Sequence, residues 1–225
     1  MRSAQSAAQL ATDHARDLLD RYYRRVRRDS DSICRPLETE DYCIQTMPDV
    51  SPAKWHLAHT SWFLETFLLD RFQSGYRAFH PAYDHLFNSY YLTHGMPYFR
   101  PQRGLLARPT VAEIYRYRDW VDTAMERLIA NVSGKWWEPV HQLVALGLNH
   151  EQQHQELLLT DLKNIFAHNP LRPVYRELPQ PPAQAALALT WREFEGGVHW
   201  IGHQGEGFRY DNEGPRHRVW LEDFA

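Results

Sequence analysis

Apolar and aromatic side chains recur at three- and four-residue steps through much of the first 168 residues, and no strand-like alternation interrupts them. This spacing places the apolar groups along one face of a helix. Each face has to be buried against another helix, because nothing in this part of the chain predicts a sheet to cover it. The predicted helices are residues 6–28, 52–72, 110–131 and 136–168. The sequence therefore predicts a mainly α fold, an antiparallel four-helix bundle.

Local signals indicate where two of these helices begin. Ser51 is a suitable N-cap before Pro52, because proline fits the first helical position. Thr110 and Glu113 have the spacing of a capping box. A long aromatic-rich connection separates the second and third helices, and a short helix is expected in it at residues 83–91. Connections of this length in a compact domain are often functional.

The character of the chain changes after residue 169. Five prolines between residues 170 and 183 predict an extended linker, which we place at 170–192. Residues 193–225 alternate in the period of strands and carry glycine-rich turns. About 33 residues of β pattern cannot bury a core by themselves. We therefore expect residues 1–169 to form the helical domain and residues 193–225 to begin a second, α+β domain that continues further.

Charge and composition exclude several classes of protein. Lys and Arg number 25 against 28 Asp and Glu, a net charge of −3, which argues against coating nucleic acid or an anionic membrane. The basic end of the first helix fits a solvated face better than a nucleic-acid patch, and its residues are Arg21, Arg24, Arg25, Arg27 and Arg28. No apolar run approaches the roughly 18 residues that span a bilayer. We expect a cytoplasmic protein without nucleic-acid or membrane partners.

Histidines supply the strongest chemical signal. His150 and His154 stand four residues apart in the fourth predicted helix, on a stripe that otherwise holds leucines, so both imidazoles face inward on one side. Buried imidazoles need hydrogen-bond partners or a metal ion, and this spacing favours a shared ion. His59 faces inward on the second helix and provides a third ligand, while His56, one turn earlier, is the alternative.

The same residues allow other interpretations. The pattern His-Glu-x-x-His of zinc proteases fits His150 to His154, with Glu151 as the general base. A zinc hydrolase or a thiol transferase is therefore an alternative, and a bundle whose histidines only pack is another. Three neutral imidazoles leave coordination positions open for exogenous ligands, and their spacing alone suits zinc and iron(II) equally.

Arg100 and Arg103 lie in a predicted loop beside glycine and proline. Two guanidinium groups there suit a substrate carboxylate, although an ordinary surface position explains them as well. Gln153 is next to the last histidine of the pair, where it either hydrogen-bonds a substrate or is solvated.

Several separated motifs together resemble those of the ergothioneine-biosynthesis sulfoxide synthases (EgtB-like proteins). The likeness covers nearly the whole chain. In the helical part the motifs are residues 45–63, 86–91 and 150–156, and beyond it 195–198, 201–203 and 211–219. The resemblance implies a DinB-like bundle joined to the start of a formylglycine-generating-enzyme-like domain, in a chain truncated at its C-terminus.

The resemblance also implies an activity, that of an oxidoreductase. A non-haem iron(II) ion, Fe(2+), is held by the residues that match His59, His150 and His154. With dioxygen, the family joins a thiol, γ-glutamylcysteine or cysteine, to the imidazole of hercynine as a sulfoxide.

The family's substrate contacts map onto the remaining polar residues. Arg100 and Arg103 resemble the arginine pair that holds the thiol substrate's carboxylates, and Gln153 matches a position that contacts hercynine. The family's catalytic tyrosine falls beyond Ala225, so we expect residues 1–225 alone to turn over little.

Overall fold

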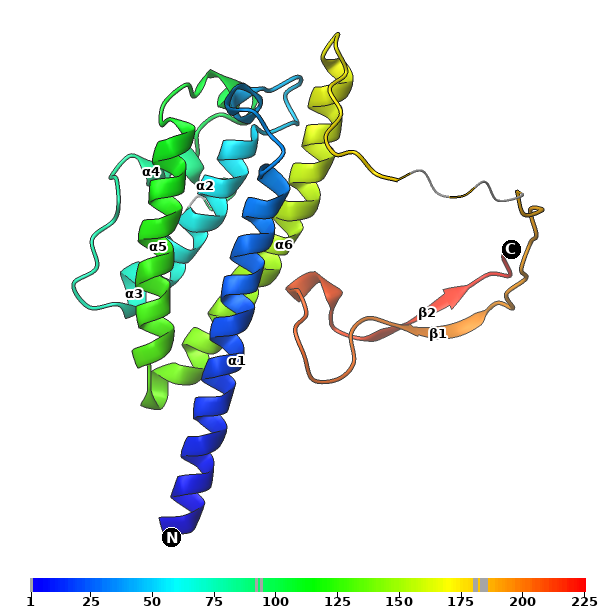
Figure 1. The fold of residues 1–225 in the computed structure, drawn as a ribbon. Helices are drawn as coiled ribbons and strands as arrows, with labels where there is room; N and C mark the ends of the chain where they lie inside the picture. Colours follow the sequence, from blue (N-terminus) through cyan, green and yellow to red (C-terminus); the bar gives the residue numbers. More distant parts are fainter. Residues whose placement is uncertain (1, 92, 94, 180–181, 183–185) are drawn as a thin grey trace. The chain divides into compact units, whose positions relative to one another are not determined.

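The structure is a computed structural model, which describes residues 2–91, 93, 95–179, 182 and 186–225. The chain divides into two compact units, Met1–Glu177 and Leu178–Ala225. The first unit is helical and the second carries a two-stranded sheet (Figure 1), so the predicted mainly helical fold is confirmed. The boundary between the units falls inside the predicted linker, residues 170–192, of which 180–181 and 183–185 lie outside the described residues.

Four long helical segments build the first unit. The helices are α1 (Arg2–Cys34), α2 (Ala53–Leu64), α3 (Asp70–Phe72), α4 (Tyr83–Phe87), α5 (Val111–Asn131) and α6 (Trp137–His168). α1 packs against α5 and α6, and α2 packs against the same two helices. A π-helical segment, Glu65–Leu69, continues α2 directly into α3.

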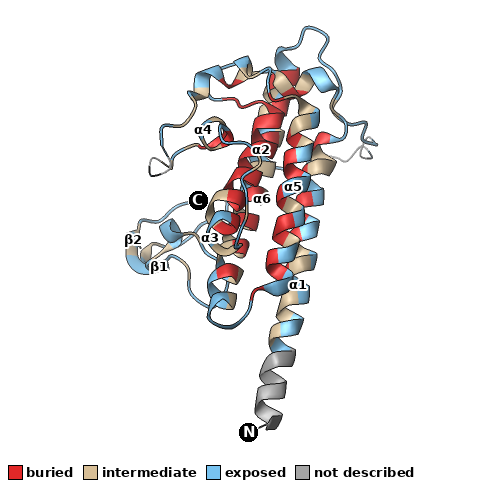
Figure 2. Ribbon diagram, turned by 90° about the vertical axis from the view of Figure 1, so that its left-hand side faces the viewer, coloured by how far each residue is buried: buried red, intermediate tan, exposed pale blue. Residues whose placement is uncertain are grey.

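α2 is the centre of this unit, and all twelve of its residues are buried. Figure 2 shows the buried residues gathered along α2 and on the helices around it. A helix that is surrounded on every side usually has an apolar sequence. α2 instead buries polar side chains as well, among them Lys54, His56 and His59, each of which forms hydrogen bonds. Because unpaired buried polar groups are costly, these pairings fix the orientation of α2.

The capping box at Thr110 is confirmed, whereas the predicted N-cap of α2 and the predicted end of α1 are wrong. Thr110 Oγ1 accepts from the Glu113 N–H at 3.2 Å, and Glu113 accepts from the Thr110 N–H at 2.7 Å. The prediction of Ser51 as an N-cap was wrong, since Pro52 occupies that position and Ser51 is engaged elsewhere. α1 runs six residues past the predicted end at residue 28, to Cys34, because its last turns are also buried against the core.

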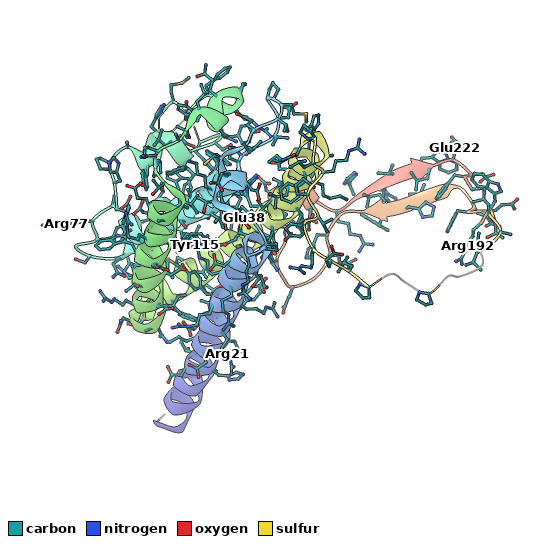
Figure 3. All side chains as sticks on the ribbon, turned by 45° about the horizontal axis from the view of Figure 1, so that its top comes forward. Arg21, Glu38, Arg77, Tyr115, Arg192 and Glu222 are labelled. Atoms are coloured by element: carbon teal, nitrogen blue, oxygen red, sulfur yellow. The ribbon has the colours of Figure 1, made fainter. Side chains whose placement is uncertain are left out.

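Most of the basic residues at the end of α1 are solvated, as expected. Figure 3 shows the side chain of Arg21, an exposed residue of α1, projecting outward. Arg27 is an exception: it is buried and forms ion pairs with Asp122 at 2.7 Å and Glu151 at 2.9 Å. The prediction of a solvated Arg27 was therefore wrong, because acidic groups from α5 and α6 meet it inside the helical unit.

The second unit contains the two predicted strands. β1 (Gly197–Ile201) and β2 (His217–Leu221) are antiparallel, with His199 opposite Val219. Trp200 and Trp220 remain about three-fifths exposed, at 58% and 62%, so the hairpin has no core of its own. In the described part of the chain, no helix is both long enough and apolar enough to cross a membrane.

Candidate metal centre

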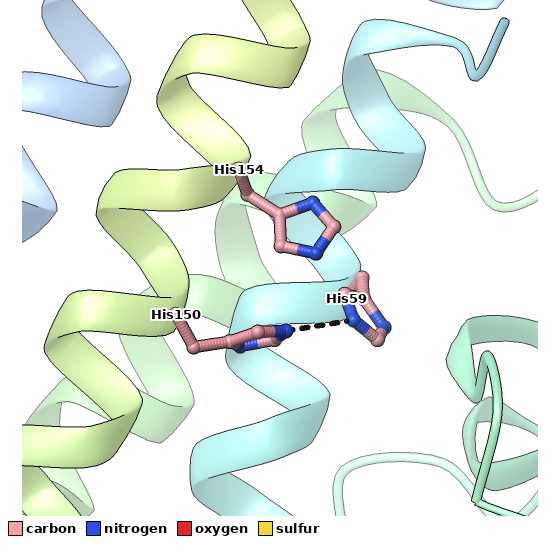
Figure 4. Close-up of side chains that lie close together, drawn as sticks. All are labelled: His59, His150 and His154. Carbon is pink, nitrogen blue, oxygen red and sulfur yellow. Dashed lines mark hydrogen bonds between the residues drawn. The ribbon is translucent and has the colours of Figure 1, made fainter. Parts of the chain in front are cut away.

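Three imidazoles meet between α2 and α6. His59 comes from α2, and His150 and His154 come from successive turns of α6 (Figure 4). One nitrogen from each ring lies within 4.8 Å of the others, and the Nε2 atoms of His59 and His150 are 3.3 Å apart. The structure therefore brings together the three residues that the sequence proposes as ligands.

The two helices can approach this closely because of a glycine. Gly147 lies one turn before His150, and a Cβ atom there would stand 3.0 Å from Cδ2 of Leu64 and 3.3 Å from a ring carbon of Phe63. A contact of 3.0 Å is tighter than van der Waals packing allows. The missing side chain thus lets α6 rest against α2 at the level of the histidines.

His59 is held in one tautomer and one ring plane. Its Nδ1 donates to the carbonyl oxygen of Phe87 at 2.5 Å, and a carbonyl can only accept. The Nε2 lone pair of the neutral ring therefore faces the other two histidines. The indoles of Trp55 and Trp62 stack on its two sides, with ring centroids at 4.6 Å and 5.5 Å, and keep the imidazole from rotating.

In the described part of the chain, the ring nitrogens of these three histidines are not all paired by hydrogen bonds. The Nε2 atoms of His59 and His150 can share only one proton, and Nδ1 of His150 is buried with no hydrogen-bond partner in the described part of the chain. Such orphaned buried nitrogens are rare in folded proteins. A cation held by the Nε2 atoms of His59 and His150 would replace the one proton that they must share, and neutral imidazoles are common metal ligands, so the residues present fit a metal ion.

All three rings are neutral near pH 7. Burial lowers the pKa of His150 to about 4. Burial, followed by the neighbouring His150, lowers the pKa of His59, and burial followed by His59 and His56 lowers that of His154. The neutral imidazole is the form that binds a metal, so the environment keeps the cluster ready for one.

A cavity of about 480 Å³ opens onto the cluster, and the predicted substrate residues Arg100, Arg103 and Gln153 all line it. Arg103 is only 4% exposed, which excludes the alternative of an ordinary surface arginine for this residue. The expected loop is a 3-10 helical turn, Arg100–Leu105, which turns both arginines toward the cavity wall. Gln153 is exposed at the rim.

Neither arginine is neutralised within the described residues, where no carboxylate forms an ion pair with Arg100 or Arg103. The guanidinium of Arg103 lies 3.3 Å from the centre of the Trp55 ring and donates to Ser51 Oγ at 2.9 Å. The Nε atoms of both arginines are buried and have no hydrogen-bond partner among the residues that the structure describes. Burial and the nearby Arg100 lower the pKa of Arg103 to about 9, which leaves it charged at neutral pH. This unopposed charge suits an anionic ligand.

The helices that hold this centre match a known family. A family model for the DinB superfamily covers residues 22–158, more than half of the chain. The chain belongs to the DinB superfamily. No curated protein matches the sequence significantly. The matched range includes α2 and most of α6, so the three histidines lie inside the DinB domain.

Glu151 of this DinB domain does not face the three histidines. Its carboxylate accepts from Arg27 at 2.9 Å, Ser30 at 2.7 Å and Arg118 at 3.3 Å, and the residue is 1% exposed. Burial alone would raise the pKa of Glu151, but Arg27 and Arg118 hold it below its usual value. A carboxylate locked between two guanidinium groups has no free oxygen for proton abstraction. The geometry thus removes the general base from the His-Glu-x-x-His interpretation.

His56 lies behind the three histidines of the DinB domain, where it contacts the proposed ligand His154. Its Nδ1 is 2.9 Å from Nδ1 of His154, and its Nε2 is 3.0 Å from Oδ2 of Asp161. Sequence reasoning missed Asp161. The signal was present, because Asp161 follows His154 by seven residues, which is two turns along the same helix face.

Proposed function

We propose that this chain carries the iron(II) centre of a dioxygen-dependent sulfoxide synthase, which joins γ-glutamylcysteine or cysteine to hercynine in ergothioneine biosynthesis. The observation that carries the proposal is the cluster of three neutral imidazoles in the wall of a cavity that also contains two unneutralised arginines. The choice of substrates in this proposal rests on the likeness of the sequence to EgtB-like proteins.

The histidines hold the ion without cancelling its charge. When bound, iron(II) would supply dioxygen activation and bring the thiol and the substrate imidazole together. Neutral ligands favour an anionic thiolate as a further ligand, because the ion keeps its full positive charge. His59 in particular is set for this role, since Phe87 and the flanking indoles fix its tautomer and its plane.

The arginines bind and orient the thiol substrate. Trp55 and Ser51 hold the Arg103 guanidinium in place, and Arg100 Nη1 donates to the hydroxyl of Tyr90 at 3.2 Å. A guanidinium that is already positioned loses little entropy when it pairs with a carboxylate. Gln153, at the rim, contacts hercynine. In this proposal the helical unit is an antiparallel four-helix bundle, and residues 193–225 belong to a formylglycine-generating-enzyme-like domain.

The zinc hydrolase alternative receives no support from the site. It requires Glu151 to take a proton beside the metal, and that carboxylate is committed to Arg27 and Arg118.

An anaerobic titration of the metal-free protein tests the proposal. We expect one iron(II) or cobalt(II) ion per chain, and His59→Ala should abolish tight binding. Cysteine or γ-glutamylcysteine added to the cobalt form should produce sulfur-to-cobalt charge-transfer absorption. Oxygen uptake by the iron form, even at low turnover, should require both thiol and hercynine.

Arginine variants separate the binding of the thiol from the binding of the metal. Arg103→Gln should raise the thiol concentration needed for saturation by about tenfold, with cobalt affinity retained. Arg108→Gln is the matched control, since Arg108 is exposed and does not line the cavity. Absence of stoichiometric metal binding, or an unchanged thiol response in Arg103→Gln, would contradict the proposal.

A further inference from the structure

Behind the metal cluster, three side chains form a continuous row of hydrogen bonds from Asp161 through His56 to His154. We propose that Asp161 and His56 are positioning residues, which fix the tautomer and the ring orientation of His154 so that its Nε2 lone pair faces the metal. The inference rests on the proposed metal centre and adds to it two residues that are not ligands.

The row starts at a carboxylate that is itself fixed. Oδ2 of Asp161 accepts from the backbone N–H of Ser51 at 2.9 Å and lies 3.0 Å from Nε2 of His56. Asp161 has a side chain that is 13% exposed, and that of His56 is 5% exposed, so water competes little for this contact. A carboxylate only accepts, which requires the proton of His56 to be on Nε2.

The direction of the next hydrogen bond follows from the first. A neutral His56 with its proton on Nε2 has only a lone pair at Nδ1, and this atom is 2.9 Å from Nδ1 of His154. His154 must then donate from Nδ1, which leaves the lone pair on its Nε2.

The arrangement gives two of the three proposed ligands the same tautomer by different means. His59 donates from Nδ1 to the carbonyl of Phe87, whereas His154 donates from Nδ1 to a second histidine. Partners of this kind orient ligating imidazoles in metalloproteins, and their loss typically reduces metal affinity by about 10- to 100-fold. We expect the row to matter for His154 because, among the described residues, its Nδ1 pairs with His56 and with no backbone carbonyl.

Two substitutions at one position separate hydrogen bonding from packing. His56→Phe keeps a ring of similar size but removes the acceptor that faces His154. His56→Gln loses the ring, but its carbonyl can accept from His154 while its amide donates to Asp161. Cobalt(II) affinity, measured by d–d absorption, should fall about 10- to 100-fold in His56→Phe and stay within about threefold of wild type in His56→Gln.

A control on the same helix tests whether any lost hydrogen bond has this effect. Asn164 accepts from Thr46 Oγ1 at 2.6 Å, and among the described residues its side chain forms no hydrogen bond with His56 or with the three proposed ligands. Asn164→Ala should therefore leave cobalt affinity and the d–d spectrum unchanged. An equal loss of affinity in this variant, or none in His56→Phe, would overturn the proposal.

The tautomer is measured directly by nitrogen-15 spectra of the imidazoles in metal-free protein. We expect His154 to carry its proton on Nδ1, and a proton on Nε2 would overturn the proposal even if His56→Phe failed to fold. The same measurement distinguishes the two levels of inference. If the wild-type protein bound no metal, the proposed function would fail, and the tautomer of His154 would still decide whether the row operates.

Discussion

Glu151 illustrates how the surroundings of one residue decide which chemistry it can perform. In the sequence it lies between the proposed ligands His150 and His154. Its side chain points in a different direction from theirs and contacts α1 and α5. Two guanidinium groups and a hydroxyl donate to its two oxygens, so that each oxygen is engaged. This carboxylate therefore links α6 to α1 and α5, and the three proposed ligands that line the cavity are neutral imidazoles.

Removing that charge should be strongly destabilising. In Glu151→Gln the buried Arg27 and Arg118 would lose their shared partner, and breaking a buried ion pair typically costs about 3–5 kcal/mol. Urea unfolding followed by circular dichroism measures the change. Glu156→Gln, at an exposed position of the same helix, is the control and should stay within about 0.5 kcal/mol of wild type. A loss below about 1 kcal/mol in Glu151→Gln would show that the pair contributes little.

The two cysteines should differ sharply in reactivity. Cys34 is fully buried, and burial raises the pKa of its thiol to about 12, whereas Cys43 is half-buried. At pH 8 the thiolate fraction of Cys34 is then about one in ten thousand, and the thiolate is the reactive form. In native protein, a chromogenic disulfide reagent should therefore react quickly with one thiol, that of Cys43, and with the thiol of Cys34 only in denaturant. Two equally fast thiols in the native state would contradict this.

At the scale of the elements, the proposed metal centre depends on the spacing of two helices. α2 supplies His59 and α6 supplies the other two histidines, so a small displacement of one helix moves ligands apart. The tight contact at Gly147 sets this spacing close to the site. Helix packing at such a point affects both stability and ligand geometry.

Gly147→Val should weaken both folding and metal binding. The added side chain would collide with Leu64 and Phe63, and overpacking of a buried contact typically costs about 1–3 kcal/mol. We expect lower urea stability together with a weaker cobalt affinity. Gln142→Val places the same β-branched residue at an exposed position of α6 and controls for helix propensity. Unchanged cobalt affinity in Gly147→Val would mean that the helices absorb the displacement without moving the ligands.

At the scale of the whole molecule, periodic and local patterns were predictable, and long-range pairings were not. The bounds of α5 and α6 and the capping box at Thr110 follow from signals within a few residues of each other. The end of α1 and the role of Ser51 depend on contacts with distant parts of the chain.

The candidate site divides in the same way. The four-residue spacing of His150 and His154 and the inward position of His59 could be read from the sequence as one cluster. The pairing of His56 with Asp161 could not, because it joins residues 105 positions apart across two helices. The same holds for Glu151, whose partners come from α1 and α5 and whose motif suggested a different role.

The division into two units predicts where the stability of the molecule resides. Both hydrophobic clusters, together with the side chains packed on them, lie between Leu19 and Tyr175. The second unit has a single antiparallel hairpin, and an isolated two-stranded hairpin is marginally stable in water.

Residues 1–177 should therefore fold without the second unit. We expect cooperative urea unfolding and cobalt(II) binding close to those of the full chain, because the core and the three histidines are all retained. Residues 178–225 alone should show no cooperative transition by circular dichroism. Loss of folding or of metal binding in residues 1–177 would mean that the second unit contributes to the site or to the core. Retention of both would place the metal centre wholly within the first unit.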